Sequence, residues 1–211
     1  MVAPVSLVIP VRAFDDAKSR LSGVLSDRDR RELAVECARR VIGSIPGADV
    51  FVVCDDDEVA EFARQLSATA VQVDVAGLNA ALTEGMPRIM NERPDQPVIV
   101  AHADLPFGER LRDLWSELSP TSTTTSLVIV PDEARDGSNV VVIGSGLVTR
   151  WRFLYGTGSF TAHVTQSREL GVEPLVVADD LLSLDLDTPH DLENPKVADQ
   201  LDRLIRSRSR Q

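Results

Sequence analysis

Short apolar runs alternate with longer amphipathic stretches along the first half of the chain. Residues 5–11 (VSLVIPV) are continuously apolar, which is typical of a strand buried on both faces. Ser26 is the expected N-cap of a helix in which apolar residues recur at helical spacing as far as Ile45. Pro87 should bend or divide the third helix. Further strands are expected within 46–57, 69–75 and 97–103, and helices within 56–66, 77–92 and 108–118.

The second half of the chain departs from this alternation. Two apolar runs, at 121–133 and 138–145, have no helical stretch between them, which predicts a β-rich excursion. Thr188 as N-cap, Pro189 as the first helical residue and Asp191 two residues later form a capping pattern for the last helix. The elements expected after the excursion are a glycine-led helix, two strands and that final helix, at 156–170, 173–177, 181–187 and 188–205.

Strands that alternate with helices predict the α/β class. We expect a single domain over residues 1–206, with a mostly parallel sheet and helices on both faces, followed by a frayed basic tail at 207–211. Ligands of such sheets bind outside the carboxyl ends of the strands. The residues that directly follow each strand are therefore the first candidates for chemistry.

Charge and composition narrow the function classes. The chain has 211 residues, 43% of them hydrophobic, and its net charge of -11 excludes a broad basic surface for nucleic acid. A local cationic pocket can still bind an anionic small molecule. Because no apolar run approaches the roughly 20 residues that span a bilayer, and no signal-peptide pattern is present, we expect a cytoplasmic protein without a membrane partner. Cys37 and Cys54 are expected to be buried packing residues.

Carboxylates follow two of the expected strands. Asp104 comes directly after the run at 97–103, and Asp185 and Asp187 are two residues apart, so that in a strand they would share one face. Carboxylates that converge at one sheet edge repel each other unless a cation lies between them, and Mg²⁺ commonly takes one or two carboxylates. Asp104 and Asp185 fit that arrangement. Asp104 could instead cap the helix after Pro106, and Asp187 could cap or support rather than bind the metal.

The loop after the first strand carries the opposite charge. Arg12, Lys18 and Arg20 lie at the expected carboxyl end of that strand, where cations can neutralise phosphates during phosphoryl or nucleotidyl transfer. The alternative is a solvated basic loop. The chain contains neither a Walker A sequence nor G-x-G-x-x-G, which disfavours a P-loop kinase or an ordinary dinucleotide-binding domain.

Six segments occur in the order seen in a known enzyme family: VIPVRAFDDAKSRLS, GLNAAL, VAHADLP, DGSNVVV, YGTGSFTAH and LDLDTPHDL. Through them the chain resembles the guanylyltransferases of coenzyme F-420 biosynthesis. That family includes 2-phospho-L-lactate guanylyltransferase and phosphoenolpyruvate guanylyltransferase. The resemblance spans residues 5 to about 193, and its most specific parts are the AKSRL loop, GSF and LDLDTP.

The resemblance implies a nucleotidyltransferase-like fold of the GT-A, Rossmann-like type. It also implies a Mg²⁺-dependent reaction that joins GTP to a phosphorylated three-carbon acid and releases diphosphate. Asp104 and Asp185 match the metal positions, and Lys18, Arg20 and Asp104 are the implied catalytic residues. The implied nucleotide-binding positions are Pro10, Arg12, Lys18, Arg20 and Asn79, and those for the acid are Ser138, Gly156, Ser159 and His163.

Some of these positions keep alternatives. Arg12 stands where relatives commonly have Lys, so the geometry of its contact with the nucleotide is open. Ser138 stands where relatives usually have Thr, so the identity of the acid that it binds is open. Asn79 could contact base or ribose, or cap a helix. Glycines before the helix at 156–170 leave N–H groups that can hold a phosphate or carboxylate. His163, on the same face as Ser159, could donate to the acid or join a buried polar pair.

Phosphoenolpyruvate is the first choice of acceptor, because YGTGSF and the chain length look closer to bacterial forms. 2-Phospho-L-lactate and 3-phospho-D-glycerate stay open, as does a homodimer. A sugar-phosphate nucleotidyltransferase or glycosyltransferase of the same fold is a different enzyme class. Against it, the chain lacks G-G-x-x-x-R after the first strand and D-x-D after the fourth. A nucleotide-binding paralogue without turnover is the non-enzymatic alternative, which the acidic pair and the basic loop disfavour.

Overall fold

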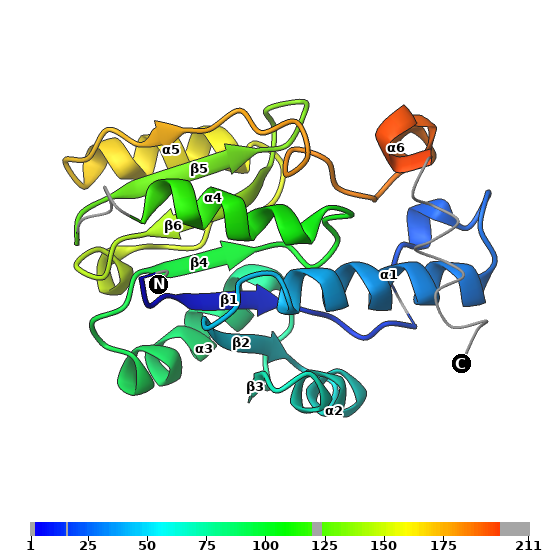
Figure 1. The fold of residues 1–211 in the computed structure, drawn as a ribbon, viewed down its shortest axis with the longest axis horizontal. Coiled ribbons are helices and arrows are strands. Elements are labelled where there is room, and N and C mark those ends of the chain that lie inside the picture. The colour runs from blue at the N-terminus through cyan, green and yellow to red at the C-terminus, as the bar shows by residue number, and fades with distance from the viewer. Residues whose placement is uncertain (1–2, 16, 120–123, 199–211) are drawn as a thin grey trace.

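The structure is a computed structural model that describes residues 3–15, 17–119 and 124–198. Its centre is a seven-stranded sheet in the order β3-β2-β1-β4-β6-β5-β7 (Figure 1). Four strands form a parallel half, whose carboxyl ends lie along one edge: β1 (Ser6–Pro10), β2 (Asp49–Cys54), β3 (Thr69–Gln72) and β4 (Val98–Ala101). This half confirms the strands expected from the first four apolar runs.

The expected β-rich excursion forms the other half of the sheet. β6 (Ser138–Ile143) lies between β4 and β5 (Leu127–Pro131) and is antiparallel to both. β7 (Leu175–Val176) pairs in parallel with the outer side of β5. Because β6 runs against β4, its first residue, Ser138, lies at the sheet edge where β4 ends.

Helices cover both faces of the sheet, as expected. In β1, Leu7 and Ile9 face the core layer under α1, α2 and α4, whereas Val8 faces the layer under α3 and α5. These helices are α1 (Asp27–Ile42), α2 (Asp57–Gln65), α3 (Leu78–Glu92), α4 (Leu111–Leu118) and α5 (Ser159–Glu169). Short 3₁₀ turns are η1 (Ser19–Leu21), η2 (Gly108–Arg110) and η3 (Val148–Arg150).

Helix starts follow the expected capping chemistry. The Ser26 hydroxyl accepts a hydrogen bond from the Asp29 N–H at the start of α1. α6 (Pro189–Glu193) begins with the expected capping box between Thr188 and Asp191. The expected helix is interrupted at Asn194, which precedes Pro195 and adopts an extended ψ of 124°, and residues 195–198 are helical again. Residues 199–205 of the expected helix and the tail at 207–211 lie outside the described residues.

Two expectations about local structure are wrong, namely that Pro87 could divide the third helix and that residues 181–187 form a strand. Pro87 does not divide α3, because it lies on the exposed side while the buried Met86 and Ile89 hold the helix against the sheet. Residues 181–187 do not form a strand. Leu184 and Leu186 are buried in alternation, as in a strand. The Leu186 N–H donates to the carbonyl of Asp104, which follows β4, and the Ser183 carbonyl accepts from the Glu133 N–H, but these bonds build no ladder.

Candidate active site

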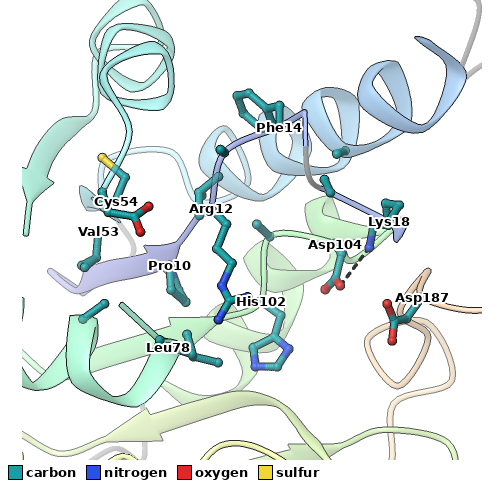
Figure 2. Close-up of a pocket in the computed structure, with 18 of the residues that line it drawn as sticks. Pro10, Arg12, Phe14, Lys18, Val53, Cys54, Leu78, His102, Asp104 and Asp187 are labelled. Atoms are coloured by element: carbon teal, nitrogen blue, oxygen red, sulfur yellow. Dashed lines mark hydrogen bonds and ion pairs between the residues drawn. The ribbon is translucent and has the colours of Figure 1, made fainter. Parts of the chain in front are cut away.

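A pocket of about 800 Å³ opens at the carboxyl edge of the parallel half of the sheet (Figure 2). Its volume lies within the range of small-molecule sites. The ends of β1, β2 and β4 supply the floor, and the irregular segment at 181–187 closes one side. Six of the expected site residues line it, namely Pro10, Arg12, Lys18, Arg20, Asp104 and Asp185, and Asp187 joins them.

Lys18 and Asp104 form the charged centre of the pocket. The Lys18 ammonium donates to Asp104 Oδ2 at 2.9 Å, and only 6% of the lysine side chain is exposed. Lys18 adopts a left-handed backbone conformation (φ 59°, ψ 33°), uncommon for a residue with a side chain, at the turn that leads into η1. Burial opposes the charge of Lys18, but the Asp104 carboxylate outweighs it and the pKa of the lysine is raised.

Asp104 has one oxygen committed and one without a partner. Burial alone would raise the pKa of Asp104, yet the Lys18 ammonium holds that pKa below its usual range, so the group is a carboxylate. Its Oδ1 is buried and has no hydrogen-bond partner among the described residues. The alternative that Asp104 caps a helix is wrong. The N-caps of η2 and α4 are Phe107 and Arg110, and neither element has a side-chain cap.

Asp185 meets Asp104 in the pocket although it lies in no strand. Burial raises the pKa of Asp185 to about 7, and the Asp104 carboxylate adds to the rise. A cation between the two would relieve both the repulsion and the unpartnered Oδ1 of Asp104. In the described part of the chain, no three His, Cys, Asp or Glu side chains form a metal cluster, so such a cation would draw on these two carboxylates, water and substrate.

Asp187 does not cap the last helix. Its carboxylate pairs with the Arg20 guanidinium at 2.6 Å, and the capping of α6 falls to Thr188 and Asp191. Arg20 is 71% exposed on its side chain, so the pair lies at the rim of the pocket. Arg12 extends across the middle of the pocket towards His102 (Figure 2). Arg12 has no ion pair within the described residues.

Asn79 lies outside the pocket lining. Its Nδ2 donates to the Tyr155 carbonyl at 2.9 Å and its Oδ1 accepts from the Tyr155 N–H at 2.8 Å, so both ends of the amide bind the Tyr155 backbone. The helix-cap alternative is wrong, because Gly77 is the N-cap of α3. Asn79 therefore fastens the start of α3 to the loop before α5.

Three of the four expected acid-binding residues, Ser138, Ser159 and His163, form a buried network. His163 Nε2 accepts from the Leu154 N–H at 3.2 Å, which leaves Nδ1 as the N–H that donates to the Ser138 hydroxyl at 3.0 Å. The Ser159 hydroxyl accepts from the Ser138 N–H at 3.1 Å. Burial lowers the pKa of His163 to about 4, with His102 adding to the effect, so the ring is neutral. For His163 the geometry matches the buried polar pair.

The start of α5 already has an internal acceptor. Asp136 accepts from the Gly158 N–H through its carboxylate at 3.1 Å and from the Phe160 N–H through its carbonyl at 3.0 Å. Gly156 is exposed and has a positive φ of 126°, which favours glycine at this turn. None of Ser138, Gly156, Ser159 and His163 lines the pocket that holds Lys18 and Asp104.

Residues 5–196 match the protein family described as Guanylyl transferase CofC like. The chain belongs to this family. The resemblance drawn from the sequence motifs is therefore confirmed, and the CofC-like protein is a nucleotidyltransferase.

Two curated relatives illustrate the range of names within the CofC-like group. Phosphoenolpyruvate guanylyltransferase of Rubrobacter xylanophilus is 36% identical over 189 residues, which cover 88% of this chain and 90% of the relative. 2-Phospho-L-lactate guanylyltransferase of Methanocaldococcus jannaschii is 27% identical over 187 residues, which cover 88% of this chain and 80% of the relative. The alignments span nearly the whole CofC-like domain in both cases.

A solved structure confirms the fold of the CofC-like chain. A nucleotidyl transferase from Methanothermobacter thermautotroptrophicus superposes with a TM-score of 0.64 over 94% of this chain and 98% of that one, at 17% identity. The sheet order and the two helical layers are thus those of a nucleotidyltransferase. Among the described residues of the CofC-like chain, no helix is both long and apolar enough to cross a bilayer.

The motifs did not single out every polar residue of the CofC-like pocket. Asp55 lines it directly after β2, and its position at a strand end was the available signal. The rings of His102 and Tyr155 contact each other at an interplanar angle of 50°, with centroids 5.1 Å apart. His102 Nε2 and the Tyr155 hydroxyl are buried without hydrogen-bond partners among the described residues. No motif within one sequence segment predicts this contact, because His102 and Tyr155 are distant in the chain.

Proposed function

We propose that this protein transfers the guanylyl group of GTP to a phosphorylated three-carbon acid, with release of diphosphate, in coenzyme F-420 biosynthesis. Membership of the CofC-like family and the names of the curated relatives support the reaction class. The observation that carries the proposal is the Lys18–Asp104 pair beside Asp185, in one pocket at the carboxyl edge of the sheet. This arrangement can bring two anionic substrates together inside an acidic protein.

Mg²⁺ is the proposed cofactor, held by Asp104 and Asp185. The fit rests on the unpartnered Oδ1 of Asp104 and on the raised pKa of Asp185. A hard divalent cation would give Oδ1 a partner and would stabilise the charged form of Asp185. When bound, the ion supplies charge neutralisation for the phosphates. With Asp104 and Asp185 as its protein ligands, the ion would take its remaining oxygen ligands from water and phosphate.

The chain's own cations would handle the triphosphate. Lys18 sits at the charged centre, Arg20 at the rim and Arg12 across the middle, and Pro10 forms part of the wall beneath. Their positive charge would offset the charge that develops on the transferred phosphorus and on the diphosphate leaving group. The acceptor is already an anionic phosphate, so the reaction needs positioning more than a strong general base. Asn79 would contribute by positioning the start of α3.

Phosphoenolpyruvate is the proposed acceptor, as named for the relative that is 36% identical. Gly156, with exposed backbone beside Ser159, would meet the acid, and the buried Ser138–His163 pair would shape that side of the site from below. 2-Phospho-L-lactate and 3-phospho-D-glycerate are the alternative acceptors. Each differs from phosphoenolpyruvate in geometry at the carbon next to the carboxylate, which a fixed acid site can distinguish.

Diphosphate release tests the proposal directly. The purified protein is incubated with GTP and Mg²⁺ together with one acceptor at a time, which is each of the three acids or a sugar phosphate. Released diphosphate is followed over time, and GTP binding is measured separately. Release that depends on phosphoenolpyruvate is the expected result, and release with a sugar phosphate instead would overturn the proposal in favour of that enzyme class. GTP binding without release under any condition would indicate a non-catalytic paralogue.

A further inference from the structure

The pocket has two chemically different ends. Lys18, Asp104 and Asp185 make one end charged, whereas Val53 and Leu78 make the other largely apolar. Figure 2 shows this separation, with Val53, Cys54 and Leu78 on one side of Arg12 and Lys18, Asp104 and Asp187 on the other. If phosphates occupy the charged end, the apolar end is left for the flat, weakly hydrated faces of a nucleotide base.

The strand order sets the distance between the two ends. β2 and β4 are the neighbours of β1 on opposite sides, so their carboxyl ends are two strand spacings apart, about 10 Å. Asp104 follows β4 and Asp55 follows β2. This separation is comparable to the reach of a nucleotide from its first phosphate to its base.

Asp55 is the acidic group of the apolar end. It lines the pocket and is exposed there, and within the described residues its carboxylate has neither a hydrogen bond nor an ion pair. Its neighbour Asp56 has a structural task, because its side chain accepts from the Val59 N–H as the N-cap of α2. By contrast, Asp104 and Asp187 are already paired with Lys18 and Arg20.

The start of α3 adds donors at the same end. Gly77 is the N-cap of this 15-residue helix, lines the pocket, and provides no side-chain cap for the first N–H groups. Its positive φ of 97° suits glycine, and a Cβ there would meet no atom within 4 Å, so the conformation and not crowding accounts for the residue. Uncapped N–H groups and a free carboxylate thus line the same pocket.

We propose that Asp55 selects guanine, an inference that rests on the proposed use of GTP. The N1–H and the 2-amino group of guanine are two adjacent donors, and a carboxylate can accept both, while the O6 acceptor matches N–H donors. Adenine presents the acceptor N1 at the place of the N1–H and has no 2-amino group. Its edge would set a lone pair against the Asp55 carboxylate, so ATP is rejected.

Replacing Asp55 by Asn should exchange the preferred base. A carboxamide offers one acceptor and one donor, which matches the N1–H and the C2 carbonyl of xanthine instead of the two donors of guanine. We expect the wild type to favour GTP over ITP, which lacks the 2-amino group, by about ten- to a hundredfold in kcat/KM. In Asp55→Asn the preference for GTP over XTP should reverse.

The experiment measures kcat/KM for diphosphate release with GTP, ITP, XTP and dGTP, in the presence of phosphoenolpyruvate and Mg²⁺. Asp74→Asn is the matched control: Asp74 is an exposed carboxylate that follows β3 at the same sheet edge but does not line the pocket. Its base preference should equal that of the wild type. Asp55→Ser serves as a second variant, which should lose the discrimination between GTP and ITP.

Two outcomes would overturn the assignment. An Asp55→Asn enzyme that keeps the wild-type order of GTP over XTP shows that another group reads the base. Equal losses for GTP, ITP and XTP, together with a lost discrimination against dGTP, would place Asp55 on the ribose hydroxyls. A wild type that releases no diphosphate from GTP with any acid would refute the proposed function itself, which separates that failure from a failure of the assignment.

Discussion

The ammonium of Lys18 and the carboxylate of Asp104 lie 2.9 Å apart although 86 residues separate them in the chain. One residue follows β1 and the other follows β4, and these strands are neighbours in the sheet. The parallel pairing of β1 and β4 therefore brings a cation and a carboxylate together at the centre of the site. This ion pair also makes the site sensitive to the loss of either partner.

Lys18→Met should destabilise the protein and abolish turnover. The change leaves the Asp104 carboxylate without its ammonium, and we expect a loss of about 2 kcal/mol in the free energy of unfolding, less than for a fully buried pair because 29% of the Asp104 side chain is exposed. Urea unfolding measures it. Lys196→Met removes an ammonium from an exposed pair with Asp180 and should change stability by less than about 0.5 kcal/mol. Equal effects of the two substitutions would contradict the central role of Lys18.

Asp185→Asn should stabilise the metal-free protein at high pH. The pKa of Asp185 is raised in the folded state to about 7, so the folded protein is penalised for ionising this group, and the penalty grows as the pH rises from about 4 to 7. The variant avoids the penalty. Its advantage over the wild type should shrink by about 2 kcal/mol between pH 8 and pH 5.

Urea unfolding in a metal chelator at the two pH values measures this change. Asp180→Asn, which removes a carboxylate whose side chain is 89% exposed, is the control. A constant difference between Asp185→Asn and the wild type at pH 5 and pH 8 would show that Asp185 is not desolvated in the fold. Added Mg²⁺ should reverse the order at pH 8, because only the wild type retains both carboxylates.

Ser138→Ala should cost about 1–3 kcal/mol of stability. It leaves the buried Nδ1–H of His163 without its acceptor, in a place where water cannot replace the hydroxyl. Ser138→Thr keeps the hydroxyl and adds one methyl group. Thermal unfolding of both variants measures the contribution of the Ser138 hydroxyl to stability. The kcat/KM of both variants with each of the three acids measures its contribution to acceptor preference. If Ser138→Ala melts like the wild type, the network does not support this part of the fold.

Asn79→Ala should destabilise the protein without removing a contact to the nucleotide. Both hydrogen bonds to the Tyr155 backbone are lost, at about 2 kcal/mol in total. Isothermal titration should then give a Kd for GTP close to the wild-type value at a temperature where the variant is folded. A large rise in that Kd with unchanged stability would instead support a direct contact of Asn79 with base or ribose.

Local patterns were sufficient for the parallel half of the sheet. Buried strands such as Ser6–Pro10 are continuously apolar, and the helices between them are amphipathic and capped, so each element is marked within its own residues. The segment at 181–187 shows where this fails. Its alternation of Leu and Asp reflects burial against Leu21 and Phe107, and alternation of burial cannot reveal whether a neighbouring strand is present.

The charged end of the pocket was predictable for a topological reason. Residues after parallel strands meet at one edge, so the sequence alone places Lys18 and Asp104 together. The hydrogen-bond partners of Asn79 and His163 could not be predicted from the sequence. Tyr155 lies 76 residues from Asn79, and Ser138 lies 25 residues from His163, and nothing in the intervening sequence marks these pairs. The same strand-end rule applies to Asp55, which the family motifs did not emphasise.

The antiparallel insertion of β6 between β4 and β5 has a consequence for how such an enzyme can change. The parallel half carries the proposed nucleotide contacts, whereas Ser138 and the loop at 156–159 belong to the inserted half and its helix. Within the described sheet, the two halves meet only along the seam between β4 and β6. Substitutions on one side of that seam can therefore retune the acceptor while the donor site stays intact, so that acceptor and donor preference can evolve as separate traits.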